Sequence, residues 1–179
     1  MLGLIFMLKK YKEDKMRFGS KKVTDENGVI WDSTTEYKYG LKLKELQEKG
    51  VIKDLQRQVP YLLIPAFKDG QGNSVRKTEY VADFVYTDVA TGHTIIADSK
   101  GSEFNIDPVF KLKFKMLKEK FKDRKDIEFQ VIIKYKDVWY NLENKEEKKK
   151  YKEIYKNRKK KTKKLNGTIT RFKRCFIFM

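Results

Sequence analysis

The sequence has little cysteine, histidine and proline: its 179 residues include one cysteine, one histidine and three prolines. The single cysteine, Cys175, excludes an internal disulfide and a cysteine-based zinc site, and is typical of a reducing compartment. The single histidine, His93, excludes a histidine-rich metal site, and we expect it in a loop or at the surface rather than as a catalytic base. Apolar residues still make up 40% of the chain, which is enough to form the core of one domain.

Long hydrophobic runs are also absent. The two chain ends carry short apolar runs, Met1–Leu8 (MLGLIFML) and Cys175–Met179 (CFIFM). A membrane span needs about 20 apolar residues, and the first run lacks the preceding basic region and the cleavage site of a secretory signal. We therefore expect a cytoplasmic protein with no membrane partner, in which these runs form strands or pack on the core. An interfacial anchor is the alternative.

Acidic residues are outnumbered, 25 against 42 basic ones, which leaves a net charge of +17. Residues 145–164 hold 12 basic and 3 acidic residues, a net of +9, and residues 165–179 add three positive charges, so that 1–144 keep only +5. This division predicts an N-terminal segment at 1–20, a globular domain at 21–140 and a lysine-rich C-terminal extension at 141–179.

Such a charge favours a polyanionic partner, most simply a nucleic acid. The extension mixes lysines with Tyr151 and Tyr155, a pattern that suits a phosphate backbone and exposed bases. Candidate contacts within it are Lys159, Lys160 and Lys161. A solubilising helix or a disordered extension explains the same composition. A membrane surface is disfavoured because the segment lacks an apolar face.

Hydrophobic periodicity predicts two main helices and four strands. The helices are expected at Ser33–Lys49, with Tyr37, Leu41 and Leu46 on its apolar face and Gly50 at its end, and at Pro108–Lys122. The strands are expected at Gln58–Ile64, Thr78–Thr87, His93–Lys100 and Glu128–Tyr135, with turns at Lys68–Ser74 and Asp88–Gly92 and a further helix at Asn144–Lys160. The order α-β-β-β-α-β indicates an α/β fold with a small mixed sheet flanked by helices.

Two carboxylates and a lysine stand out on neighbouring predicted strands. Asp98 and Lys100 are two residues apart and therefore face the same way, and antiparallel pairing across the short loop brings Asp83 alongside Asp98. Ionised carboxylates between apolar strand residues cost free energy unless something neutralises them. Mg²⁺ neutralises one or two carboxylates and accepts phosphate oxygens, and Mn²⁺ substitutes for it. The alternative is a structural salt bridge between Asp83 and Lys100.

Five segments of the chain resemble the PD-(D/E)XK nuclease superfamily, whose restriction-endonuclease-like core runs α-β-β-β-α-β with acid–X–lysine on the third strand. The segments are GVIWDSTTEY (28–37), LQEKGVIKDLQRQVP (46–60), YVADFVY (80–86), ADSKG (97–101) and FKLKFK (110–115). Together they are most similar to a phage-encoded family described as Holliday junction resolvase-like or of uncharacterised function. Ala82 replaces the proline of the superfamily name, and Gly40 stands where such helices carry a bulkier residue.

The resemblance implies a Mg²⁺-dependent DNA endonuclease that acts on four-way junctions as a homodimer, in the cytoplasm of a phage-infected or prophage-carrying bacterium. Asp83 and Asp98 would hold the metal and Lys100 would assist the attacking water. Two alternatives remain: another nuclease of the same fold, of restriction, repair or packaging type, and a non-catalytic DNA- or RNA-binding module.

Further site residues are expected, the first two of them from the resemblance. Glu36 matches an acid on the first helix that completes the metal site, although Ser33-Thr34-Thr35-Glu36 is equally a capping box. Gln58 matches a polar position that contacts phosphate or the metal shell. Gly101 either admits a backbone phosphate or simply ends a strand. Phosphate contacts are expected of Lys111, Lys113 and Lys115, for which a solvated helix face is the alternative.

Overall fold

The computed structural model describes residues 14–15, 21–103 and 106–158. The apolar runs Met1–Leu8 and Cys175–Met179 lie outside the described residues. So do the three candidate DNA contacts of the extension, Lys159, Lys160 and Lys161.

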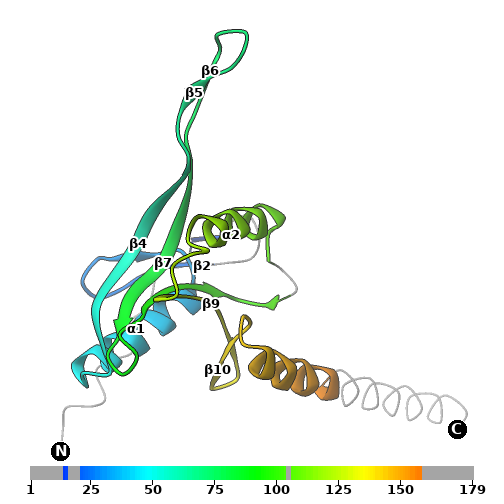
Figure 1. The fold of residues 1–179 in the computed structure, drawn as a ribbon. Helices are drawn as coiled ribbons and strands as arrows, with labels where there is room; N and C mark the ends of the chain where they lie inside the picture. The colour runs from blue at the N-terminus through cyan, green and yellow to red at the C-terminus, as the bar shows by residue number, and fades with distance from the viewer. Residues whose placement is uncertain (1–13, 16–20, 104–105, 159–179) are drawn as a thin grey trace, which may run out of the picture.

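A five-stranded mixed sheet forms the centre of the molecule, with its strands in the order β10-β9-β8-β7-β4 (Figure 1). These strands are β4 (Ile52–Ile64), β7 (Thr78–Asp88), β8 (Thr94–Lys100), β9 (Ile127–Tyr135) and β10 (Val138–Asn141). The β8–β9 pair is parallel and the other neighbours are antiparallel. The helix α2 (Pro108–Lys120) connects the two parallel strands, as a parallel crossover requires.

Two apolar clusters cover the two faces of this sheet. On one face, Leu43 of the helix α1 (Thr34–Glu48) packs with Ile95 and Ala97. On the other, Leu117 of α2 packs with Ile96, because successive strand residues point to opposite faces. The main elements α1, β4, β7, β8, α2 and β9 therefore follow the predicted order α-β-β-β-α-β, and the predicted mixed α/β fold class is confirmed.

The structure differs from the sequence prediction in several elements. Strand β4 begins at Ile52, six residues before the predicted Gln58, because a bulge between Lys53 and Gln56, with Asp54 at φ 56°, interrupts the alternation used to find it. Leu41, expected on the apolar face of α1, is 46% exposed. Six short strands were not predicted: β10, the two strands β5 (Phe67–Lys68) and β6 (Ser74–Val75), and the small sheet of β1 (Asp14–Lys15), β2 (Lys21–Thr24) and β3 (Ile30–Trp31).

The helix α1 begins and ends where the sequence indicated. The Ser33 hydroxyl caps it by accepting from the backbone N–H of Glu36, and Gly50 follows its end at φ 70°. Gly40 in its middle is required by packing: a Cβ there would lie 2.5 Å from the ring of Trp31, which is 1% exposed. The glycine thus makes room for the largest fully buried side chain.

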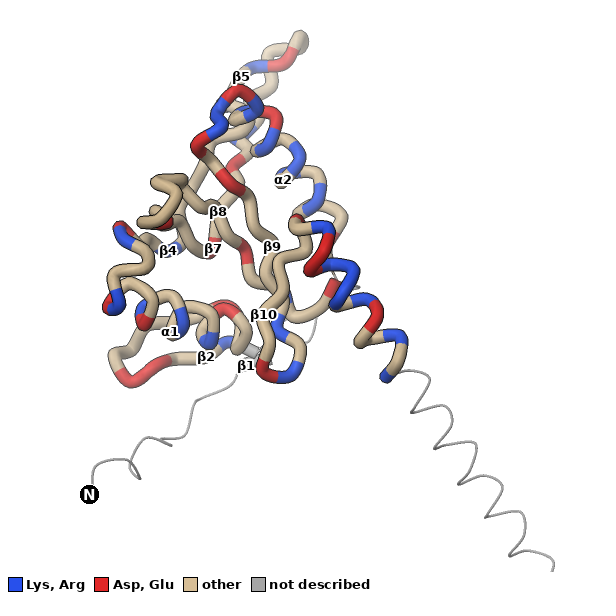
Figure 2. Tube along the Cα trace, turned by 60° about the horizontal axis from the view of Figure 1, so that its bottom comes forward, with Lys and Arg blue, Asp and Glu red and all other residues tan. Residues whose placement is uncertain are grey.

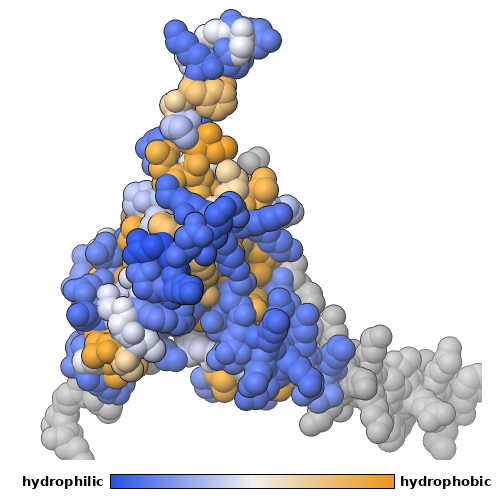
Figure 3. Space-filling model, in the orientation of Figure 1, coloured by the Kyte–Doolittle hydropathy of each residue, from blue (hydrophilic) through white to orange (hydrophobic). Residues whose placement is uncertain are grey.

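Strands β4 and β7 extend beyond the sheet as a two-stranded arm (Figure 1). Beyond a break the arm continues as β5 (Phe67–Lys68) and β6 (Ser74–Val75), and the predicted turn forms its tip. Figure 3 shows a hydrophilic tip above an apolar neck. The exposed apolar residues of the arm are Leu62, Ile64, Phe67, Val75 and Val81.

Residues 145–158 form a helix, called the C-terminal helix below, within the range predicted for the third helix, and it packs on the sheet through aromatic side chains. Tyr151 is 3% exposed, and its ring centroid lies 5.7 Å from that of Tyr140 and 6.0 Å from that of Tyr135. Among the helices of the described residues, none combines the length and apolar character that a membrane crossing requires.

Candidate functional site

The candidate site lies where β7 and β8 separate. Their pairing ends at Phe84↔Ala97, one position before Asp83 and Asp98. On the other side of β7, the pairs Arg57↔Phe84 and Val59↔Ala82 place Gln58 opposite Asp83. Three polar residues therefore occupy one row across three adjacent strands.

Asp83 bridges the gap that opens between the two strands. Its Oδ2 accepts hydrogen bonds from the Ser99 backbone N–H at 2.8 Å and from the Ser99 hydroxyl at 2.9 Å. A side-chain oxygen thus replaces the strand carbonyl that would have paired with this N–H in a continuous ladder.

Asp98 lies deeper and is held by two partners on the same side of the sheet. It is 2% exposed; Lys100 Nζ lies 2.6 Å from its Oδ1, and the Tyr80 hydroxyl donates to its Oδ2. The Lys100 ammonium also lies 4.2 Å from the ring centroid of Phe110 on α2, a cation–π contact. Asp98 and Lys100 thus point together, as two strand residues two apart do.

The electrostatics of the site follow from this crowding. Burial, together with the charge of Asp98, raises the pKa of Asp83 from its ordinary 3.8 to about 7. Burial acts to lower the pKa of Lys100, but the charges of Asp98 and Asp83 outweigh it and the pKa is raised. Burial and the Asp98 charge also raise the pKa of Tyr80 far above its usual range, so that Tyr80 remains a donor.

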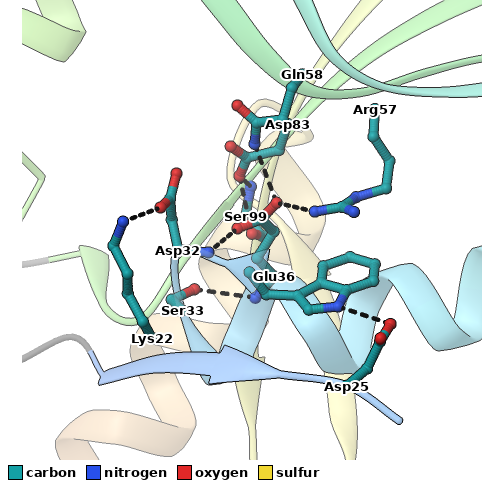
Figure 4. Close-up of polar contacts among 10 residues, drawn as sticks. Lys22, Asp25, Asp32, Ser33, Glu36, Arg57, Gln58, Asp83 and Ser99 are labelled. Carbon is teal, nitrogen blue, oxygen red and sulfur yellow. Dashed lines mark hydrogen bonds and ion pairs between the residues drawn. The ribbon is translucent and has the colours of Figure 1, made fainter. Parts of the chain in front are cut away.

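Glu36 forms a second polar group beside Asp83 (Figure 4). It is 2% exposed; its Oε1 accepts from Gln58 Nε2 at 3.0 Å and Arg57 Nη2 at 3.1 Å, and its Oε2 accepts from the Asp32 backbone N–H at 2.8 Å. The capping box is therefore half formed: the Ser33 cap is present, but Glu36 reaches back one residue beyond it. Glu36 joins helix α1 to strand β4.

The backbone at Gln58 explains how both β4 side chains reach Glu36. Neighbouring strand residues normally point to opposite faces, but Gln58 has φ 52°, a left-handed conformation that is costly for a non-glycine residue. The Arg57 guanidinium lies 3.4 Å from the ring centroid of Trp31, and its buried Nε has no hydrogen-bond partner among the described residues.

The donor set of the aspartate pair fits a hard divalent cation. Within residues 14–15, 21–103 and 106–158, no three His, Cys, Asp or Glu side chains are grouped to hold a metal ion. Two carboxylates are nevertheless what Mg²⁺ commonly takes from a protein, with waters and phosphate oxygens completing its shell. The hydrogen bonds described for Asp83 all reach Oδ2.

The remaining predicted residues lie around this centre. Gly101 directly follows Lys100 and is exposed, and a Cβ there would meet nothing within 4 Å. Lys111 and Lys115 are exposed on α2 and Lys113 is half-buried, and Figure 2 shows the basic residues along α2 and the C-terminal helix. His93 lies in the loop before β8, 2.7 Å from Glu128, away from the aspartates.

A comparison with models of protein families identifies the family of the chain. The model of a family described as a protein of unknown function (DUF1064) matches residues 15–137. The chain belongs to the DUF1064 family. The matched part of this DUF1064 protein contains Glu36, Asp83, Asp98 and Lys100, and it ends before the helical residues 145–158. No curated protein and no solved structure matches the chain.

Proposed function

We propose that this DUF1064 protein is a metal-dependent endonuclease that hydrolyses phosphodiester bonds in DNA. One observation carries the proposal: the half-buried Asp83 carboxylate, the buried Asp98 carboxylate and Lys100 lie together where two central strands separate. Buried charges of this kind raise the free energy of the folded state, so they are typical of a site that binds or reacts.

Asp83 and Asp98 would hold Mg²⁺ or Mn²⁺ through their carboxylate oxygens. When bound, such a cation polarises the scissile phosphoryl group and offsets the negative charge that develops on it. Ser99 orients the Asp83 carboxylate, and Tyr80 orients that of Asp98. Both carboxylates are thus fixed before a ligand arrives, which lowers the reorganisation needed on binding.

Lys100 would act as a cation rather than as a base. Its raised pKa keeps the ammonium protonated at neutral pH, so it donates hydrogen bonds to a phosphate oxygen or to the attacking water. Glu36 would contribute by fixing Gln58 and Arg57 beside the aspartates, and a direct role in the metal shell stays a prediction.

The expected substrate is branched DNA, and the expected active form is a homodimer that cuts two strands. Both expectations rest on the resemblance to the resolvase-like family. The basic residues along α2 and the C-terminal helix support a DNA backbone as the ligand, since they supply the cations that phosphates bind.

The test is cleavage of a synthetic four-way junction and of a linear duplex of the same sequence, with Mg²⁺, with Mn²⁺ and with a chelator. Wild type should cut the junction in a metal-dependent manner, and Asp83→Asn and Lys100→Gln should reduce the rate by orders of magnitude. Asp126→Asn, an exposed aspartate in the loop before β9, is the matched control and should cut normally. Equal cutting of the duplex would exclude junction specificity but retain the nuclease.

A non-catalytic DNA-binding module is the second candidate, because the charges at the site already pair with one another. Lys100 satisfies Asp98, and Ser99 satisfies one oxygen of Asp83, as in a structural ion-pair network. Binding of junction DNA without cleavage in either metal, unchanged by Asp83→Asn, would favour this candidate over the nuclease.

A further inference from the structure

A cavity of about 560 Å³ lies between the end of β8, the β9–β10 turn and the C-terminal helix. Its volume is in the range of small-ligand sites, about 300–1,000 Å³. The parallel register that pairs Lys100 with Ile133 puts the next residue, Gly101, beside Lys134. The cavity therefore begins one residue beyond the candidate catalytic lysine.

The lining of this cavity carries one sign of charge. Its charged residues are Lys134, Lys136 and Arg158, and no acidic side chain lines it among the described residues. Lys136 is exposed at the turn, with φ 56°. A concave surface of uniform positive charge attracts an anion.

The rest of the lining is mostly aromatic. Tyr135, Tyr151 and Tyr155 line the cavity, with ring centroids 6.0–6.4 Å apart. The interplanar angles of Tyr135 with the other two are 80° and 66°, so these rings meet edge to face rather than stacked. Tyr151 is buried, whereas Tyr155 is half-buried at the edge of the cavity. Tyrosine faces beside cations are the combination on which unpaired bases stack.

The floor of the cavity is tied to the strand of the candidate site. The Ser102 side chain hydrogen-bonds with Tyr151, which couples the residues after β8 to the C-terminal helix. The space in front of Gly101 is open, because a Cβ there meets nothing within 4 Å. A strand of nucleic acid can thus pass the backbone at Gly101 closely.

We propose that this cavity binds an unpaired nucleotide of single-stranded DNA, with its base against Tyr155 and its phosphates on Lys136 and Arg158. The inference deepens the proposed function and rests on it for the role of the cavity. With the cavity occupied in this way, DNA with an unpaired segment next to the scissile phosphate is the preferred substrate. Fully paired duplex DNA satisfies the cations but offers no base to the tyrosines.

The experiment measures binding of the full chain to a short labelled single strand, to the same strand made abasic and to the matching duplex, with a chelator present to prevent cleavage. Wild type should prefer the base-containing strand. Tyr155→Leu should weaken its binding by about 5- to 150-fold, as expected when one stacked base is lost, and should leave the abasic strand unaffected. Tyr155→Phe, which retains the ring, should bind nearly as wild type.

The charge contribution is tested separately. Lys136→Asn suits the left-handed backbone and should reduce the salt dependence of binding by about 0.7 of a log unit per log unit of salt, the value for one phosphate of a single strand. Lys125→Asn is the control, since Lys125 is exposed at the opposite end of β9 and should change nothing.

Equal binding of the base-containing and abasic strands by wild type, or wild-type binding by Tyr155→Leu, would overturn the inference. Cleavage is assayed on the same proteins, so the two proposals fail separately. Cleavage without a preference for unpaired bases retains the nuclease and removes the cavity's role. Base-dependent binding without cleavage retains the cavity and removes the nuclease.

Discussion

Replacing Asp83 by asparagine should stabilise the folded protein at neutral pH and above, and the gain should grow as pH rises to ~7 and then stay constant. The pKa of Asp83 is raised to about 7 from an ordinary 3.8, because its carboxylate is buried beside Asp98. The folded state therefore retains a proton that the unfolded chain has already lost. The favourable contribution of Asp83 to the free energy of unfolding is complete below pH ~4 and is lost as pH rises to ~7.

The size of the effect follows from the difference between the two pKa values. The folded-state pKa of Asp83 exceeds the unfolded-state pKa by about three. Since one pKa unit corresponds to about 1.36 kcal/mol, this difference corresponds to about 4 kcal/mol of unfolding free energy. Asparagine has no such dependence, and its Oδ1 can still accept from the Ser99 amide and hydroxyl. Any cost of burying its amide group is the same at all pH values, so the change in the difference with pH isolates the carboxylate.

The measurement is urea unfolding of wild type and Asp83→Asn, with a chelator, between about pH 4.5 and about pH 9. The stability of the variant minus that of wild type should rise through this range and level off above pH ~7. Asp126→Asn is the control: its pairing with Arg124 lowers the pKa of Asp126 to about 2, so its contribution is constant over this range. A constant difference for Asp83→Asn would refute the raised pKa.

Three further changes test the packing and the polar contacts by urea unfolding. Gly40→Ala should destabilise the protein by about 1–3 kcal/mol, because its Cβ clashes with Trp31; a more stable variant would show that the tryptophan moves. Ser33→Ala should lose about 1 kcal/mol of helix capping, and Ser33→Asp should restore it; equal stability of all three proteins would contradict the cap. Tyr80→Phe should lower the unfolding free energy by about 1.5–3 kcal/mol, since the hydroxyl donates to the buried carboxylate of Asp98, and by less in an Asp98→Asn background. An identical loss in both backgrounds would show that the two side chains do not interact.

Local sequence signals were enough to predict the elements that position the site. Serine before and glycine after a helical repeat predicted α1, and a short loop between two β-branched segments predicted the β7–β8 hairpin and the approach of Asp83 to Asp98. These features depend on residues close in sequence, for which spacing rules hold.

The parts that were not predicted depend on residues far apart in the chain. Tyr80 contacts Asp98 in the part of β7 that no longer pairs with β8, beyond Phe84↔Ala97, and no spacing rule indicates where that pairing ends. The left-handed conformation of Gln58 and the fit of Trp31 over Gly40 likewise arise from packing between elements. A glutamine in a strand gave no signal of positive φ, whereas an isolated glycine within the helical pattern of α1 was a signal of close packing.

The arm formed by β4 and β7 has a consequence for the order of folding. It closes a local hairpin, and β8 adds to it across a loop of a few residues, so the strands that carry Gln58, Asp83 and Asp98 meet at low sequence separation. The parallel pairing of β8 with β9 must wait for a chain closure of about 30 residues through α2, which costs more entropy. We therefore expect the two acids to be brought together before α2 and β9 bury them, so that their repulsion opposes the last steps of folding rather than the first.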